Sequence, residues 1–310
     1  MTQAPAYRKA ADLPPELQSI GTLNAYEAGR DYIRVACRLS DPNYEVGQLA
    51  ILRISMVSFS VEIEAVFDRF FTAFFSYAGI LDILVENSNV VRLRAESGWE
   101  AYQFRTKFLL EAFSLAGKTN FVLGDDGEIF RFDGRSAWVR DTVDGSERLF
   151  GMHGISSDRL YAVGRNGTVL KENEKNWERI DVGIGTTFRC ALVEKDRVVI
   201  AGNKGGAGVL AGSEYVVFET GITSDILSIC HYRGSTYFSD SDFGIHRLVD
   251  GAFEPVANLG YVYRVNEGEN WLTAAAGEYI FQFDGSTWRG IELSYRDGYR
   301  AEAFDMSFLE

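Results

Sequence analysis

Residues 160–180 read LYAVGRNGTVLKENEKNWERI, and the pattern of this stretch predicts three short strands one after another. An apolar run ends at a turn that contains Gly164 and Gly167, and an alternating apolar run follows. A polar turn then leads into a strand headed by Trp177. Runs of this length and alternation, separated by glycine and polar turns, predict β-hairpins. If the unit recurs along the chain, it predicts a repeat architecture.

The unit does recur. An aromatic residue returns at intervals of 40, 39, 39, 38, 38 and 35 residues. The aromatics that keep this period are Phe59, Trp99, Trp138, Trp177, Tyr215, Phe253 and Trp288. The same order of strands and turns accompanies them in residues 121–138, 161–177, 199–215, 237–253 and 272–288, each preceded by one more apolar strand. Four short strands in about 40 residues, repeated, are typical of a β-propeller blade.

A propeller also explains why the aromatics recur. One twisted sheet of four strands cannot bury both of its faces, whereas successive sheets packed around an axis bury each other. We therefore expect each aromatic, at the head of an outermost strand, to fill the gap between adjacent blades. Pro255 falls in such an outermost strand, where its missing N–H can face solvent.

The phase of the repeat predicts the number of blades and how the ring closes. Six complete units cover residues 70–295, and residues 31–66 supply further strands. Residues 299–309 fall one period after YVYRV (261–265) and resemble another innermost strand. We therefore expect an all-β propeller of seven four-stranded blades, closed by a C-terminal strand inside three N-terminal strands. Six or eight blades also fit the phase. Residues 1–28 are expected to be an N-terminal extension, and residues 29–310 a single propeller domain.

Charge narrows the class of partner. The chain of 310 residues has a formal net charge of −13. An acidic surface repels nucleic acid and anionic membranes, so we expect neither as a partner. It favours a basic protein partner, although negative charge also keeps a protein soluble without serving any partner.

Cysteine usage and hydropathy indicate a compartment. The three cysteines, Cys37, Cys190 and Cys230, are odd in number and form no CxxC motif. Buried free thiols are therefore expected, rather than disulfides or structural zinc. The N-terminus has no apolar signal region, and no apolar run approaches the length of a membrane span. We expect a cytoplasmic protein.

The units resemble those of bacterial propellers of the broad WD-repeat-like and BNR-like class. The motif that carries the resemblance is an apolar run, VGxxGTV, a polar turn and a tryptophan, at 163–177. FDGSTW at 283–288 departs from the sialidase-type Asp box, because its aspartate and glycine are adjacent, and the Trp-Asp dipeptide of WD repeats is missing. The resemblance implies the architecture and brings no catalytic residue with it.

Aspartates in equivalent turns of two units are the candidate metal ligands: Asp125, Asp126, Asp240 and Asp242. Carboxylates gathered in turns can bind calcium. Asp and Gly are also the residues that such turns need for their backbone angles, and this second interpretation is favoured. GNKGG (202–206) lacks the rest of a phosphate-binding motif and is expected to be a hairpin turn.

Candidate channel residues lie on the expected innermost strands. His153 and His231 are among them, whereas His246 is not. Because these two histidines come from blades that are not adjacent, packed or solvated side chains are favoured over metal binding. Glu111, Asp305, Arg189 and Asn266 are also expected there and could polarise the channel mouth. The loop at 40–47 breaks the repeat, which makes Asp41, Asn43, Tyr44 and Glu45 candidates for partner binding.

Two functions remain open. The first is a non-catalytic binding protein that uses an acidic propeller face to hold a protein partner, with neutralisation of a basic toxin as an immunity protein as one form. The second is a glycan-binding or glycan-hydrolysing propeller with its site at the channel mouth, where two carboxylates would suffice for catalysis. The first is favoured, because blade packing accounts for the recurrent aromatics. We expect no cofactor in either case.

Overall fold

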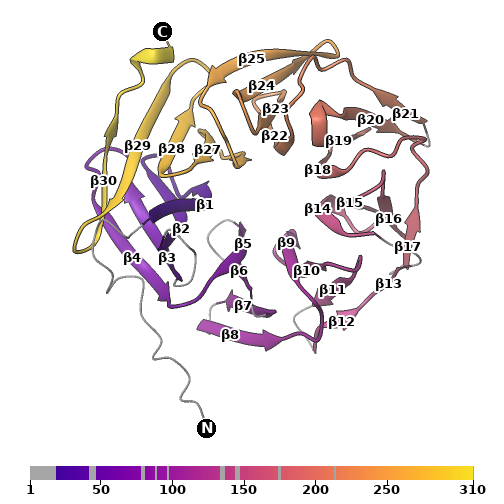
Figure 1. Cartoon of the computed structure of the whole chain (residues 1–310), viewed down its shortest axis with the longest axis horizontal. Coiled ribbons are helices and arrows are strands. Elements are labelled where there is room, and N and C mark those ends of the chain that lie inside the picture. The colour runs from indigo at the N-terminus through magenta and orange to yellow at the C-terminus, as the bar shows by residue number, and fades with distance from the viewer. Residues whose placement is uncertain are drawn as a thin grey trace.

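The computed structural model is an all-β ring of seven blades around a central channel (Figure 1). It describes residues 19–41, 47–77, 81–87, 89–95, 98–132, 137–143, 147–173, 176–212 and 214–309. Each blade has four antiparallel strands in sequence order from the channel outwards, and blades 4 and 7 carry a fifth outer strand. The predicted seven-bladed propeller is confirmed.

The strands follow one another blade by blade. Blade 1 contains β1 (Ser19–Glu27), β2 (Tyr32–Ser40), β3 (Gly47–Ser55) and β4 (Val61–Phe67). Blade 2 contains β5 (Phe71–Tyr77), β6 (Leu81–Glu86), β7 (Val90–Ala95) and β8 (Gly98–Gln103). Blade 3 contains β9 (Leu109–Leu115), β10 (Thr119–Gly124), β11 (Ile129–Phe132) and β12 (Val139–Arg140). Blade 4 contains β14 (Leu149–Ser156), β15 (Arg159–Gly164), β16 (Val169–Asn173) and β17 (Asn176–Arg179), with β13 (Thr142–Val143) parallel to β17.

The remaining blades keep this plan. Blade 5 contains β18 (Phe188–Val193), β19 (Val198–Gly202), β20 (Ala207–Ala211) and β21 (Glu214–Val217). Blade 6 contains β22 (Ile226–Tyr232), β23 (Ser235–Asp240), β24 (Gly244–Val249) and β25 (Ala252–Asn258), and Pro255 lies in that outermost strand as predicted. Blade 7 contains β26 (Arg264–Asn266), β27 (Leu272–Ala276), β28 (Tyr279–Phe283), β29 (Trp288–Tyr295) and β30 (Tyr299–Phe304). The turn η3 (Asn203–Gly205) joins β19 to β20, so GNKGG is the expected hairpin turn.

The predicted closure by a C-terminal strand is wrong. β30 pairs with β29 as the fifth, outermost strand of blade 7, at the rim of the ring in Figure 1. A short turn at 296–298, with Asp297 and Gly298 at positive φ, folds β30 directly back onto its neighbour in sequence. This local hairpin closes a far smaller loop than insertion beside the N-terminal strands would require.

The predicted N-terminal boundary at residue 28 is wrong as well, because the place expected for the C-terminal strand is occupied by an N-terminal one. Ser19–Glu27 is β1, the innermost strand of blade 1, and it pairs with β2 from Ser19 opposite Ser40 to Glu27 opposite Ile33. Its sequence, SIGTLNAYE, is too polar to read as a core strand, because one side of it faces the channel. Residues 1–18 lie outside the described part of the chain.

Blades 7 and 1 therefore meet by packing and hydrogen bonds, with no strand exchanged. A core cluster joins Ala275, Ile291 and Leu293 of blade 7 to residues of blade 1 that include Ala25 and Val35. At the channel, the Thr22 N–H donates to the Gly277 carbonyl at 2.7 Å. The Glu27 carboxylate accepts hydrogen bonds from the backbone N–H groups of Asn270 and Trp271. Contacts made by β1 thus carry a large part of ring closure.

The seven periodic aromatics pack between neighbouring blades, as predicted, although Trp288 heads a strand that β30 makes the second from the outside and Phe59 lies in the turn before β4. Each lies in a different apolar cluster, and each cluster joins two neighbouring blades. Trp99 of blade 2 meets Phe67 of blade 1 with ring centroids 5.1 Å apart. Trp138 of blade 3 meets Phe104, which follows blade 2, at 5.3 Å. Burial of large aromatic surfaces between sheets is therefore the repeated stabilising contact of the ring.

Trp177 allows this contact to be tested. Its indole is buried between blades 3 and 4, and its Nε1–H donates to the Asp141 carboxylate at 2.9 Å. We expect Trp177→Phe to lower the free energy of unfolding by about 1–2 kcal/mol, because it leaves a cavity and removes that donor. Chemical denaturation followed by circular dichroism measures the change. Phe108→Leu, at a half-exposed position, is the control, and equal stability of all three proteins would contradict the assignment.

The three cysteines are free and buried, as the sequence predicts. Burial raises the pKa of the Cys37 and Cys190 thiols to about 12, and it raises the pKa of the Cys230 thiol as well. Thiols of this kind are unreactive side chains of the core. Within the described residues, no helix is long and apolar enough to cross a membrane.

Candidate functional site

The innermost strands place a ring of polar side chains along the central channel. Glu111 on β9, Arg189 on β18 and Asn266 on β26 line it, as predicted from the phase of the repeat. Asp305 does not, because it follows the outermost strand β30, where its carboxylate accepts from the Ser307 N–H and hydroxyl. That error follows directly from the wrong prediction for the C-terminal strand.

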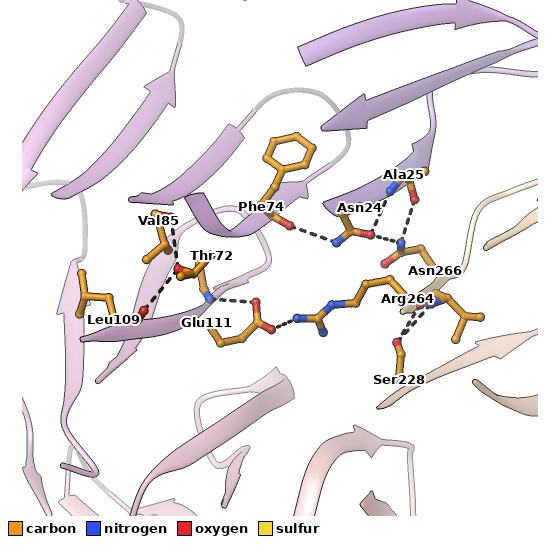
Figure 2. A network of polar contacts seen from close by, with 12 residues as sticks. Asn24, Ala25, Thr72, Phe74, Val85, Leu109, Glu111, Ser228, Arg264 and Asn266 are labelled. Atoms are coloured by element: carbon orange, nitrogen blue, oxygen red, sulfur yellow. Dashed lines mark hydrogen bonds and ion pairs between the residues drawn. The ribbon is translucent and has the colours of Figure 1, made fainter. Parts of the chain in front are cut away.

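A polar network crosses the channel near its middle (Figure 2). The Arg264 guanidinium, from blade 7, reaches the Glu111 carboxylate of blade 3 and forms an ion pair. Beside it, the Asn266 side-chain amide donates to Asn24 Oδ1 at 2.6 Å, and the Asn24 amide donates to the Phe74 carbonyl at 3.0 Å. These bonds tie blades 7, 1 and 2 together at the axis.

This network divides the channel into two cavities that share Glu111, Arg189 and Arg264. We call the larger one the histidine mouth. It has a volume of about 920 Å³, opens where the innermost strands end, and is lined by residues that include His153 and His231. We call the smaller one the tyrosine mouth. It has a volume of about 710 Å³, opens where those strands begin, and is lined by residues that include Tyr261 and Tyr263.

The carboxylates of the histidine mouth are mostly held by other groups. Glu64 accepts from Arg34 Nε at 2.6 Å, Glu27 holds the loop at Asn270, and Glu111 pairs with Arg264. Just outside this cavity, Glu194 accepts from the Thr236 hydroxyl at 3.0 Å and lies 3.3 Å from His231 Nδ1. The polar groups here connect neighbouring blades.

His153 is held as a neutral side chain. Its Nδ1 accepts a hydrogen bond from the Val193 N–H at 3.0 Å, and its ring lies 5.7 Å from the ring of Phe113. Burial lowers the pKa of His153 to about 4. The side chain therefore joins blades 4 and 5 as a hydrogen-bond acceptor. This agrees with the expectation of a packed histidine.

This histidine makes stability depend on pH. The unfolded chain binds a proton at His153 below about pH 6.5, whereas the folded chain does so only near pH 4. The contribution of His153 to the free energy of unfolding is therefore fully present above pH 6.5. It is lost as the pH falls towards 4, by about 1–3 kcal/mol in total. His153→Gln keeps an acceptor oxygen and does not titrate. We expect denaturation between pH 7 and pH 4 to show a shallower loss for this variant, and parallel profiles would contradict the assignment.

The tyrosine mouth has a different composition. Three arginines line it, Arg38 from β2, Arg189 from β18 and Arg264 from β26, and Glu111 is the one carboxylate among its described lining residues. Arg189 donates to Asn203 Oδ1 at 2.6 Å and to the Asp225 carboxylate at 3.0 Å.

Aromatic rings surround these cations. Arg264 lies 5.4 Å from the ring centroid of Tyr263, and Arg189 lies 5.7 Å from that of Phe150. Burial raises the pKa of the Tyr263 hydroxyl, so this group stays neutral. Arginine and aromatic side chains therefore dominate one mouth of a protein that is acidic overall.

The four turn aspartates lie in two separate places, Asp125 and Asp126 after β10 of blade 3 and Asp240 and Asp242 at the end of β23 in blade 6. Asp240 Oδ1 accepts from the backbone N–H groups of Asp242, Phe243 and Gly244, and His246 Nε2 lies 2.6 Å from its other oxygen. Asp125 pairs with Arg148, and Asp126 pairs with Lys107 at 2.9 Å. Across the described residues, no group of three or more His, Cys, Asp or Glu side chains is placed to hold a metal ion. The hydrogen bonds of Asp240 to its own turn fit the turn interpretation, and Asp125 and Asp126 form ion pairs instead.

The loop candidates are only partly visible. Asp41 directly follows β2, the strand whose Arg38 lines the tyrosine mouth. Asn43, Tyr44 and Glu45 lie outside the described residues. The sequence did not single out Arg38, because it lies within the apolar strand YIRVACRL (32–39), nor Tyr261 or Tyr263, because YVYRV reads as one innermost strand. The structure begins that strand only at Arg264.

Comparison with known proteins supports the fold. No protein-family model matches the chain, and no curated protein matches its sequence. The solved structure of the WD40 β-propeller domain of Doa1 aligns with this chain with a TM-score of 0.66 and 9% sequence identity. The alignment covers 94% of this chain and 96% of the Doa1 chain. YCF48 bound to a D1 peptide has a TM-score of 0.61 and 10% identity, covering 98% and 100%. These likenesses confirm the fold-level resemblance to WD-repeat-like propellers.

Proposed function

We propose that the chain is a non-catalytic binding protein that holds a protein partner at one mouth of its channel. The observation that carries the proposal is that the channel's central charged groups, Glu111 and Arg264, are paired with each other across the axis. A carboxylate and a guanidinium paired in this way stabilise the ring and are not arranged as a catalytic acid and base. The function of the ring is then to present its surface to a partner. YCF48, a propeller of similar shape, is described with a bound peptide, which supports the same use here.

The charge of the chain favours a basic partner. A net charge of −13 speeds the approach of a basic protein, because complementary charge steers diffusional encounter. Neutralisation of a basic toxin, as by an immunity protein, is the most specific form of this proposal. It rests on net charge, and the steering that it requires weakens as salt screens the charges.

Affinity capture tests the proposal. The tagged protein is incubated with lysate of its own cells at low and at high salt, and the bound proteins are identified by mass spectrometry. We expect one stoichiometric protein, and we expect it to be basic and recovered less at high salt. A partner recovered equally at both salt concentrations would contradict charge steering, and an empty capture would contradict the proposed function.

A glycan-directed function is the second candidate, and one observation favours it. Glu267 lines the histidine mouth, and partial desolvation there raises its pKa. A raised pKa suits a general acid in glycoside hydrolysis. Incubation with a panel of glycans tests this function. Hydrolysis that is lost in Glu267→Gln would support it, and absence of hydrolysis and of glycan binding would exclude it.

A further inference from the structure

The innermost strand of blade 7 is unlike the others. β26 has three residues, whereas the innermost strands of blades 1 to 6 have between six and nine. Residues 259–262, which directly precede this strand, lie outside the sheet of blade 7, and the first bond to that sheet is donated by the Tyr263 N–H to the Ala275 carbonyl at 2.9 Å. They run along the rim of the tyrosine mouth, where Tyr261 and Tyr263 line the cavity.

Backbone hydrogen bonds fix this departing segment. The N–H groups of Leu259 and Gly260 both donate to the Phe243 carbonyl, at 3.0 and 2.9 Å. The Val262 N–H donates to the Asp240 carbonyl at 3.3 Å, and the Val262 side chain is fully buried. The rim is therefore held in place by blade 6, at the turn that Asp240 itself stabilises.

Anchored in this way, the rim presents an aromatic surface. Tyr261 is 53% exposed, and its ring lies nearly parallel to that of Tyr263, with an interplanar angle of 12° and centroids 6.5 Å apart. Tyrosines have few side-chain torsions to immobilise, so a fixed pair binds at a low entropic cost. Large exposed aromatics around a cavity are typical of recognition surfaces.

The arginines of this mouth define the ligand's charge. Arg38, Arg189 and Arg264 come from three different strands and line the same cavity as the tyrosines. A guanidinium presents a planar fork of donors that matches a carboxylate. Arg264 pairs with Glu111, and Arg189 pairs with the Asp225 carboxylate, so these three guanidiniums face two described carboxylates. The mouth keeps a net positive charge, which favours a ligand carboxylate.

We propose that the tyrosine mouth binds an acidic peptide segment of the protein partner, an inference that rests on the proposed function. Side-chain carboxylates of the segment meet the arginines, and its backbone and aliphatic groups lie against Tyr261. Nucleic acid is disfavoured, because the negative charge of the whole molecule repels its continuous phosphate backbone more strongly than it repels a short acidic segment of a basic partner. This inference is compatible with a partner that is basic overall. The partner's net positive charge attracts it to the acidic protein at long range, and its acidic segment pairs with the arginines once the two proteins are in contact.

Fluorescence anisotropy tests the inference with defined probes. The probes are fluorescein-labelled decapeptides of alternating Glu and Ala, with blocked termini, together with versions carrying Gln or Lys in place of Glu, and a labelled oligothymidine. We expect the Glu peptide to bind about tenfold tighter than the Gln peptide, with Lys and oligothymidine weaker still. Tyr261→Ala and Arg38→Gln should each weaken binding of the Glu peptide about fivefold or more.

Matched controls come from the opposite end of the channel. Tyr77 and Arg53 line the histidine mouth and are both accessible to solvent, at 37% for Tyr77 and 43% for the Arg53 side chain. Tyr77→Ala and Arg53→Gln should therefore leave binding of the Glu peptide unchanged. Thermal melting of each variant checks that the ring is folded, and Tyr261→Ala, at an exposed side chain, serves if Arg38→Gln is unstable.

The inference fails if the Glu peptide does not bind, if the Lys peptide or oligothymidine binds tighter, or if the tyrosine-mouth variants bind as the wild type does. The proposed function fails separately, through an empty affinity capture. A stoichiometric partner that both Tyr261→Ala and Arg38→Gln still capture would keep the proposed function and overturn only the site.

Discussion

A protein that lacks residues 1–27 is expected to lose the cooperative thermal unfolding transition of the wild type. The deletion removes β1, and with it the hydrogen-bonded partner of β2 and the channel-facing wall of blade 1. It also removes Asn24 and Glu27, which connect blade 1 to Asn266 and to the loop at Asn270. A ring that is closed by packing and hydrogen bonds, with no strand exchanged between blades 7 and 1, cannot lose an innermost strand at this seam without opening.

Circular dichroism and calorimetry measure the effect. We expect no cooperative transition for the deletion of residues 1–27, together with exposed apolar surface that binds a hydrophobic dye. Deletion of residues 1–18 is the matched control, because it leaves every described strand in place. Cooperative unfolding of both deletions near the melting temperature of the wild type would contradict the role of β1 in closing the ring.

Asp82→Ala is expected to lower the free energy of unfolding by about 3–5 kcal/mol, because it leaves buried cations without their partner. Asp82 is fully buried between blades 1 and 2. Its carboxylate accepts two hydrogen bonds from the Arg34 guanidinium, at 2.5 and 2.7 Å, and one from the Ser76 hydroxyl at 2.9 Å. Arg94 Nε lies 2.7 Å from the same carboxylate.

Arg34 shows how strongly this cluster is coupled. Desolvation opposes its charge, but hydrogen bonds to Asp82 and Glu64 outweigh this and raise the pKa of Arg34. Removal of Asp82 leaves Glu64 as the one described carboxylate that pairs with both Arg34 and Arg94. We therefore expect the double variant Asp82→Ala, Arg34→Met to recover part of the lost stability, since an apolar replacement removes the stranded charge.

Guanidinium denaturation of the four proteins of this double-mutant cycle gives the coupling energy. Glu62→Ala is the control, because Glu62 is exposed and lies 4.0 Å from Arg53, and we expect it to cost less than about 1 kcal/mol. A loss for Asp82→Ala as small as that of the control would show that the buried cluster is not a stabilising junction between the blades.

The sequence predicts the ring because each blade repeats the same order of short strands, turns and an aromatic residue that packs between blades. Trp99, Trp138 and Trp177 keep one period, since each occupies the same place between two sheets. Turn chemistry was also predictable, because the contacts of Asp240 join residues within six positions of it. Both inferences use information contained within a single unit of the repeat.

The remaining features depend on contacts between units. The ion pair Arg34–Asp82 joins residues 48 positions apart in the sequence, and Arg264–Glu111 joins residues 153 positions apart. No pattern within one unit of the repeat predicts either pair. The strand at 261–265 was predicted too early, because carbonyls of Asp240 and Phe243 in blade 6 hold the preceding segment away from the sheet. The C-terminal strand falls at the spacing of an innermost strand in the sequence. Its hairpin with β29 instead makes it the outermost strand of blade 7.

Site-specific photocrosslinking in cells tests the central claim most directly. A photoreactive phenylalanine analogue replaces Tyr261 in one variant and Tyr77, at the opposite mouth, in another. We predict that irradiation crosslinks position 261 to one discrete protein and that position 77 gives no such product. A crosslink from position 77 alone, or from neither position, would contradict a protein partner held at the tyrosine mouth.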